Sequence, residues 1–305
     1  MIDRPLPDIE SWVTLFSESS LPILRHTRRQ LDEMLENIDD VTARELSQVV
    51  LHDPIMSVRV LAYIQPLKGR RLQHDITTIA SAVMMSGVEP FFKRFQNLQT
   101  IENALKDYGP HAWLGVMQVI RRAQRAGDYA YDWAVWRHDI NAEEVHLAAL
   151  LHDLAEILLW CFAPKLALEI RDLRLQNPTM RSAAAQEKVL GFPLLGLQQA
   201  LCRVWHLPEL LKNLMDDEKT NTPRSRNVIL AVRLSRHSAD GWNDPALPDD
   251  YREIGELLHI FPQAVMQRLG VPPSSDNADE GRASIENPNP VAPSPQAPVP
   301  PPATP

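Results

Sequence analysis

The sequence predicts an all-α fold. Only 11 of the 305 residues are glycine, and the strict alternation of apolar and polar residues that marks strands is nearly absent. Apolar residues recur instead at spacings of three and four along almost the whole chain, as they do in amphipathic helices. Hydrophobic residues make up 44% and charged residues 23% of the sequence, a composition typical of globular domains with a sizeable core.

In the first part of the chain, capping residues mark the starts of the helices. Thr42 and Glu45 form a capping-box pattern. Asp53 is an N-cap ahead of Pro54 at the first helical position, so a new helix starts where the previous one ends. The helices predicted here span residues 22–37, 43–52, 54–64, 76–86 and 89–106.

Similar signals continue along the second part of the chain. Pro110 opens a helix that Gly127 is predicted to end. Asn141, with Glu144 three residues later, is predicted to cap the next helix. The helices predicted here span residues 110–126, 142–161, 163–174, 178–189, 193–204, 207–215, 225–238, 250–259 and 261–269.

The composition changes sharply after Leu269, where proline, alanine, serine and asparagine dominate. Such a segment buries too little apolar surface to offset the entropy lost on ordering, so it is predicted to be disordered with polyproline character. We therefore expect four regions: an N-terminal lead (1–20), the main domain (21–240), a C-terminal helical extension (241–270) and a disordered Pro-rich tail (271–305).

The formal net charge of −8 argues against a partner that is a nucleic acid or an anionic membrane surface, since both repel an acidic protein. The longest apolar stretch, residues 145–163, is interrupted by His152, Asp153 and Glu156. Charges at those places would be costly in lipid. The stretch is therefore predicted to be a buried helix of a soluble protein, and no membrane association is expected.

The two cysteines, Cys161 and Cys202, each lie within an apolar helical pattern and form no disulfide framework. They are predicted to be packed thiols in a reducing compartment. The first residues also lack the apolar core of a signal peptide. A cytoplasmic location is the expectation.

One polar pair interrupts the apolar run ALLHDLAEILLW: His152 and Asp153. Adjacent residues of a helix point about 100° apart, so both can bind one ion only if other helices complete the site. A divalent ion that handles phosphate esters needs several nitrogen and oxygen ligands and open positions for water and substrate. The pair is either part of such a site or a buried polar cluster with a structural role.

The surroundings of this pair resemble those of a known family. The motifs that carry the resemblance are, in order, Leu21-Pro22, His52-Asp53-Pro54, the series Ile76-Thr77-Thr78-Ile79 with Ala82-Val83 and Gly87, the block EEVHLAALLHDLAEILLW, and Trp205-His206-Leu207-Pro208. Together they resemble the HDOD family, the HD-related output domains of bacterial signalling proteins, over residues 20–240. This resemblance implies an all-helical domain of two lobes, with a regulatory role through protein contacts and no catalysis.

The resemblance also implies which residues would hold a metal ion: His111, His152, Asp153 and an aspartate on a later helix. At the later position this sequence has Val232, which cannot act as a ligand, and Glu156 stands where a hydrolase of the HD superfamily often has lysine. His111, His152 and Asp153 are therefore predicted to be remnants of a metal site. We expect no catalytic residue, no bound metal and no cofactor.

Two other functions stay open at this point. An HD-type phosphohydrolase or cyclic-nucleotide phosphodiesterase would be favoured if a carboxylate from another helix lay near His152. A nucleotide sensor could also bind in the same cleft without turnover.

For a protein partner, the expected surface is the groove between the lobes, where the helices starting at Asp53 and Pro110 should face each other. The aromatic group Tyr129, Tyr131, Trp133 and Trp136 is a second candidate surface, although burial explains it equally well.

Overall fold

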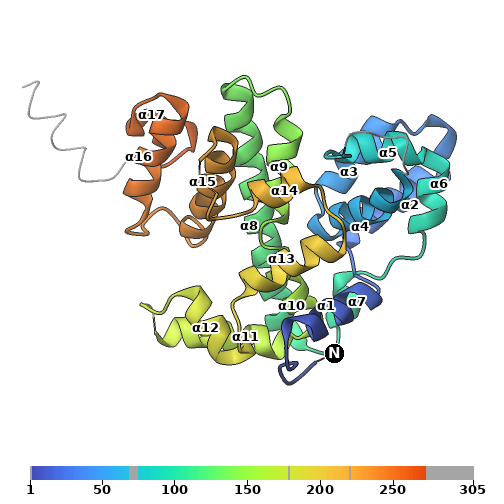
Figure 1. The fold of residues 1–305 in the computed structure, drawn as a ribbon, viewed down its shortest axis with the longest axis horizontal. Helices are drawn as coiled ribbons and strands as arrows, with labels where there is room; N and C mark the ends of the chain where they lie inside the picture. The colour runs from blue at the N-terminus through green and yellow to red at the C-terminus, as the bar shows by residue number, and fades with distance from the viewer. Residues whose placement is uncertain (1, 69–74, 178, 220, 273–305) are drawn as a thin grey trace, which may run out of the picture. The chain divides into compact units, whose positions relative to one another are not determined.

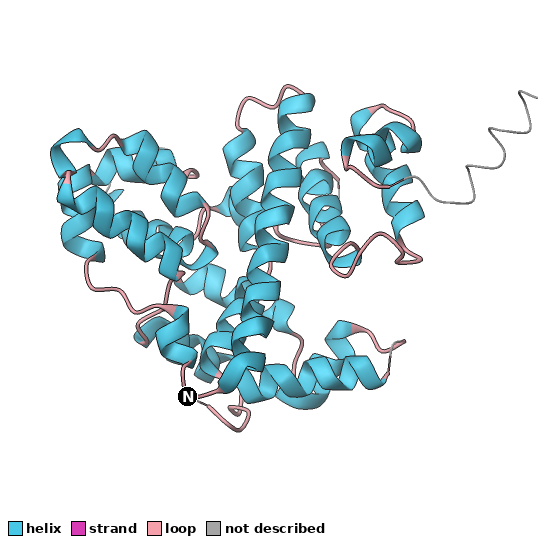
Figure 2. Ribbon diagram, turned by 180° about the vertical axis from the view of Figure 1, so that it is seen from behind, coloured by secondary structure: helices cyan, strands magenta, loops and turns pink. Residues whose placement is uncertain are grey.

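All regular structure in the described part of the chain is helical. The structure is a computed structural model, and it describes residues 2–68, 75–177, 179–219 and 221–272. Within these ranges the chain forms helices joined by loops (Figure 2), with one isolated parallel bridge between Ile23 and Thr100. The all-α prediction is confirmed, whereas the predicted tail lies outside the described residues from residue 273 onward.

The chain divides into two compact units, Met1–Val265 and Met266–Pro305. The first unit contains the predicted main domain, residues 21–240, together with the predicted lead and most of the predicted helical extension. Every candidate site residue lies in this first unit.

The first lobe is a bundle of short helices in the N-terminal part of this unit (Figure 1). It comprises α2 (Arg25–Glu36), η1 (Ile38–Asp40), α3 (Ala43–Leu51), α4 (Pro54–Ile64), η2 (Gln65–Lys68), α5 (Ile79–Ser86) and α6 (Val88–Phe95). Its centre is α4, which packs against α3 and α5 and whose residues Ile55, Met56 and Leu61 are fully buried. As predicted, Asp53 caps α4 by accepting the backbone N–H groups of Ile55 and Met56.

The second lobe is built around the long helix α8 (Gly109–Trp136), which α9, α10 and α15 contact. The other helices from this region onward are α7 (Ile101–Leu105), α9 (Ala142–Leu151), α10 (Leu154–Phe162), α11 (Pro164–Gln176), α12 (Ser182–Leu190), α13 (Leu194–Val204), α14 (Glu209–Leu214), α15 (Pro223–His237), α16 (Leu247–Leu258) and α17 (Pro262–Arg268). In the described residues, only Ala142–Phe162 is long and apolar enough to cross a membrane, and 83% of its apolar window is buried inside the protein. This stretch is therefore a core element of the second lobe.

The predicted lead contains a helix, α1 (Ile9–Glu18), which was not among the predicted helices. Asp8 caps it and accepts the backbone N–H of Ser11 at 2.8 Å. Trp12 and Phe16, one turn apart, are fully buried, and α1 packs against α13. The sequence contains two features that predict this helix: an aspartate suited to an N-cap, and after it an aromatic pair at helical spacing.

Gly127 does not end a helix, because α8 continues through it to Trp136. A Cβ atom at residue 127 would lie 3.0 Å from the His146 ring. The glycine therefore serves the close approach of α9 to α8, and the prediction of a stop was wrong.

The predicted helix 89–106 is two helices, α6 and α7. The chain leaves the helix after Phe95 and takes a positive φ of 58° at Asn97. Thr100 then caps α7 by accepting the backbone N–H of Asn103. Asparagine tolerates this left-handed conformation better than most residues, which is why the break falls there.

Candidate functional site

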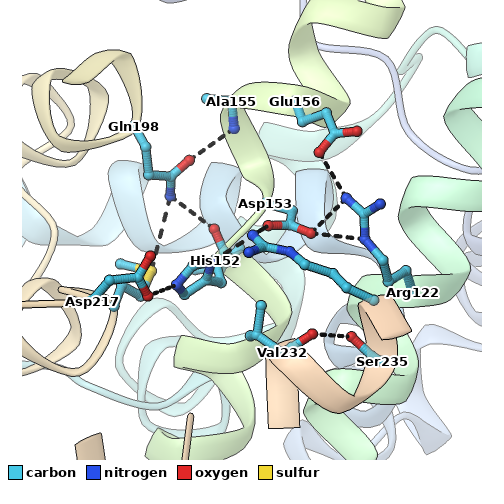
Figure 3. A network of polar contacts seen from close by, with 12 residues as sticks. Arg122, His152, Asp153, Ala155, Glu156, Gln198, Asp217, Val232 and Ser235 are labelled. Atoms are coloured by element: carbon cyan, nitrogen blue, oxygen red, sulfur yellow. Dashed lines mark hydrogen bonds and ion pairs between the residues drawn. The ribbon is translucent and has the colours of Figure 1, made fainter. Parts of the chain in front are cut away.

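The helix predicted over residues 142–161 is broken at the His152-Asp153 pair. α9 ends at Leu151 and α10 begins at Leu154, and Asp153 has φ −99° and ψ 20°. Gln198 of α13 spans the break: its amide oxygen accepts the N–H of Ala155, and its amide NH₂ donates to the carbonyl of Leu151, each at 2.8 Å (Figure 3). One buried side chain thus satisfies two backbone groups that the break leaves without helical partners.

Asp153 is held between two arginines from other helices. Arg122 of α8 donates Nε–H and Nη2–H to Oδ2 of Asp153 at 3.0 and 2.7 Å (Figure 3). Arg236 of α15 donates to Oδ1 at 2.5 Å. Burial alone would raise the pKa of Asp153, but the charges of Arg236 and Arg122 outweigh it and hold this pKa well below its usual range. Asp153 is therefore an ionised, fully paired carboxylate in the interior.

The same Arg122 binds a second carboxylate. Its Nη2 donates to Oε2 of Glu156 at 2.7 Å. Burial by itself would lower the pKa of Arg122, and the two carboxylates together raise it instead. Glu156 thus belongs to the same charge network.

His152 faces a carboxylate on each side. Its Nε2 lies 3.0 Å from Oδ1 of Asp217, in the connection between α14 and α15, and its Nδ1 lies 3.4 Å from Oδ1 of Asp153. Burial would lower the pKa of His152, but the contacts with Asp153 and Asp217 outweigh it and raise this pKa. A protonated imidazole donates from both ring nitrogens, which suits this pair of acceptors.

The structure does not bring the three predicted remnants of a metal site together. His152 and Asp153 are buried at the helix break, whereas His111 is exposed in the first turn of α8. His111 precedes Arg122 by eleven residues on one helix, a separation of about 16 Å along the axis.

Val232, where a carboxylate would be expected, is a buried apolar residue beside the network (Figure 3). Arg236 lies one turn later on the same face of α15 and reaches Asp153. Sequence reasoning missed both arginines. The sequence could have indicated Arg122, because it lies beside the apolar positions of α8, and a charged side chain close to the buried face of a helix needs a partner of opposite charge.

A divalent ion, which the resemblance described above would imply, does not fit these residues. Both oxygens of Asp153 accept guanidinium N–H groups. A cation bound to these oxygens would be repelled by Arg122 and Arg236. Asp217 does place a carboxylate beside His152, but it comes from a connection between helices. Among the described residues, no group of three His, Cys, Asp or Glu side chains is arranged to hold a metal ion.

The motif Ile76-Thr77-Thr78-Ile79 has a structural role that ties the two lobes together. Thr77 donates its hydroxyl to Oε1 of Glu144 at 2.5 Å, and the N–H of Ala80 donates to Oε1 of Glu143 at 3.2 Å. Arg224 of α15 donates to the other oxygen of Glu144 at 2.7 Å. The start of α5 is therefore bound to the start of α9 through two adjacent glutamates.

The lobes also meet at the junction of α3 and α4, where Gln124 of α8 donates to the carbonyl of His52 at 2.7 Å. α4 and α8 are in contact. Of the predicted aromatic group, Trp133 is buried and stacked on Tyr129, with ring centroids 5.9 Å apart, while Tyr131 and Trp136 are 48% and 45% exposed. That group is partly core and partly surface.

The raised pKa of His152 predicts a pH dependence of stability. A group whose pKa is higher in the folded state stabilises the fold below its unfolded pKa, about 6.5 for histidine, and loses this contribution as pH rises through the folded pKa. The unfolding free energy of the wild type should therefore fall from pH 6 towards pH 9 more steeply than that of His152→Gln. Urea titrations at several pH values measure both slopes.

The matched control is His111→Gln, which removes an exposed histidine. Its curve should run parallel to that of the wild type. Parallel curves for His152→Gln as well would contradict a charged His152 in the folded state.

Comparison with known proteins gives a family and a fold. The protein-family model HDOD domain matches residues 21–220. Among solved structures, the chain is similar to the MmoQ response regulator from Methylococcus capsulatus str. Bath, with a TM-score of 0.61 and 16% identity over 82% of this chain and 98% of that one. It is also similar to a virulence factor (cj0248) from Campylobacter jejuni subsp. jejuni, with a TM-score of 0.59 and 16% identity over 88% of this chain and 95% of that one. Among the curated proteins, none matches this sequence.

Proposed function

Because the chain belongs to the HDOD domain family, we propose that it is a non-catalytic regulatory protein that acts in signal transduction through contacts with a protein partner. The observation that supports this most is the pairing of Asp153 with Arg122 and Arg236. In an HD-type hydrolase, a metal ion would neutralise this carboxylate and present water to the substrate. Here two guanidinium groups neutralise it, and they offer no position for an activated water.

The similarity to a response regulator supports a place in signalling. The acidic net charge of −8 favours a protein partner over a nucleic acid or an anionic membrane surface. A cytoplasmic location suits the two buried free cysteines, Cys161 and Cys202.

One observation favours the alternative, a metal-dependent phosphohydrolase. Asp217 lies 3.0 Å from Nε2 of His152, so a carboxylate from elsewhere in the chain does reach the pair. Against it, Asp217 has its own role as the acceptor for His152, and both Asp153 and Glu156 are paired with Arg122. The non-catalytic function is therefore the better supported of the two.

Elemental analysis and a turnover assay separate these functions. The purified protein is expected to contain no stoichiometric Mn, Fe or Zn and to leave cyclic dinucleotides intact when Mn²⁺ or Mg²⁺ is added. Stoichiometric metal that disappears in His152→Ala, together with phosphodiesterase activity, would establish the hydrolase instead.

A pull-down with mild crosslinking tests the protein contact itself. We expect Arg121→Glu, three residues from the Gln124 contact between the lobes, to weaken partner capture more than Lys188→Glu on α12; both side chains are exposed. Equal capture by the two variants would move the partner surface away from the junction of the lobes.

A further inference from the structure

A cavity of about 300 Å³ lies where α1, α7 and α10 meet, away from the network around Asp153. Leu15 of α1, Ala104 of α7 and Phe162 of α10 form apolar walls, and Ser19, Ser20 and Gln99 supply hydroxyl and amide groups. None of the residues that line it carries a charged side chain.

Packing and backbone contacts fix the walls of this cavity. The ring of Phe162 packs on Phe16 with centroids 5.4 Å apart, and Phe16 is fully buried in the core. On the polar side, the N–H of Ile23 donates to the carbonyl of Gln99 at 2.9 Å, which joins the segment after α1 to the segment before α7. The cavity is therefore preformed, and a ligand would find it without rearranging the core.

The segment before α1 passes along the edge of the cavity. Ile2 lines it, and the N–H of Ile2 donates to the carbonyl of Phe162 at 2.9 Å. Asp3 pairs with Lys165 at 2.5 Å, but both side chains are about half exposed, so this pair holds the segment weakly. A wider depression of about 530 Å³ shares Ile2 and Leu15 with the cavity, so the two spaces are neighbours.

We propose that this cavity binds a small uncharged molecule with an apolar body and one or two hydrogen-bonding groups. The absence of a cation from the lining leaves a phosphate or carboxylate without a partner, and burying an unpaired charge is costly. The hydroxyls and the amide can orient a neutral polar group, while Leu15, Ala104 and Phe162 cover an apolar ring. The volume lies at the lower end of small-molecule sites.

The cavity is uncharged even at the thiol of Cys161, which lines it. Burial raises the pKa of this thiol, so it stays protonated at neutral pH. The inference goes beyond the proposed function and does not depend on it. A small molecule bound in the cavity would act at a site separate from both the Asp153 network and the Gln124 contact.

Three probes with one ring system test the proposal: indole, which is neutral, indole-3-acetate, an anion, and tryptamine, a cation. Saturation-transfer NMR and calorimetry with the full chain should show saturable binding of indole at one site and weaker binding of both charged probes. Ser20→Trp, which places a ring over the cavity from an exposed position, should weaken indole binding about tenfold or more, a loss of about 1.4 kcal/mol.

Ala183→Phe on the exposed face of α12 adds a comparable ring elsewhere and should bind indole as the wild type does. Ala104→Phe is a second blocking variant that fills the cavity from α7, and thermal melting verifies that each variant is folded. Absence of saturable indole binding would overturn the proposal, as would equal affinity in the wild type and both blocking variants. Tighter binding of a charged probe at this site would overturn the assigned ligand class.

Discussion

Replacing Asp153 by alanine is expected to lower the unfolding free energy by about 3–5 kcal/mol, the cost of removing one member of a buried ion pair. The carboxylate accepts three guanidinium N–H groups, two from Arg122 at 3.0 and 2.7 Å and one from Arg236 at 2.5 Å. Without it, Arg122, whose side chain is 16% exposed, would keep its desolvation cost with Glu156 as its remaining carboxylate partner, and Arg236, which is 41% exposed, would lose the carboxylate with which it pairs. Such a loss is a large fraction of the 5–15 kcal/mol that stabilises a typical domain.

Urea unfolding of the wild type and the variant measures this cost, and Glu156→Ala is the matched control. Glu156 binds the same Arg122, but its side chain is 30% exposed, so its removal should cost about 1 kcal/mol or less. If Asp153→Ala cost no more than Glu156→Ala, Asp153 would not be the centre of the network.

Replacing Asp153 and both arginines together tests whether the loss of charge pairing explains the instability of Asp153→Ala. A triple variant with Asp153→Leu, Arg122→Met and Arg236→Met should recover most of the stability lost in Asp153→Ala, because apolar groups of similar size replace buried ion pairs well. If the triple variant were as unstable as Asp153→Ala, geometry and not charge pairing would explain the loss.

Local signals in the sequence predicted much of the fold. The capping box of α3 forms as expected: Thr42 accepts the N–H of Glu45, and the Glu45 carboxylate accepts the N–H of Thr42. The N-cap at Asp53 and the proline after it also start α4 where predicted. These features depend on residues within one turn of each other, so a single sequence suffices to find them.

The interruption of the helix at His152-Asp153 could not be predicted in the same way. The apolar pattern continues across it, and the groups that stabilise the break come from α13, α8 and α15. Gln198, Arg122 and Arg236 are separated from it by tens of residues, and Arg236 lies 83 positions from Asp153. Periodicity reports which face of a helix is buried but not which distant side chain meets it.

The second large effect is expected at Asp53, which is buried and serves two helices at once. One carboxylate oxygen accepts the N–H groups of Ile55 and Met56 at 2.9 and 3.0 Å, and the other accepts the N–H of Leu24 at 2.8 Å. Leu24 is the N-cap of α2 and has no capping side chain of its own. Asp53→Ala should therefore cost about 2–4 kcal/mol, the sum of a lost cap and a stranded buried donor.

Two further variants divide this cost between the cap and the link to α2. Thr42→Ala removes an N-cap that serves α3 alone, so it should cost about 1 kcal/mol. Asp53→Asn keeps one acceptor oxygen for the cap but turns an NH₂ group towards Leu24, so its cost should fall between the other two. Hydrogen exchange at the Leu24 amide should be faster in both Asp53 variants and unchanged in Thr42→Ala. Unchanged exchange in Asp53→Ala would mean that the contact with α2 is held by apolar packing and not by this carboxylate.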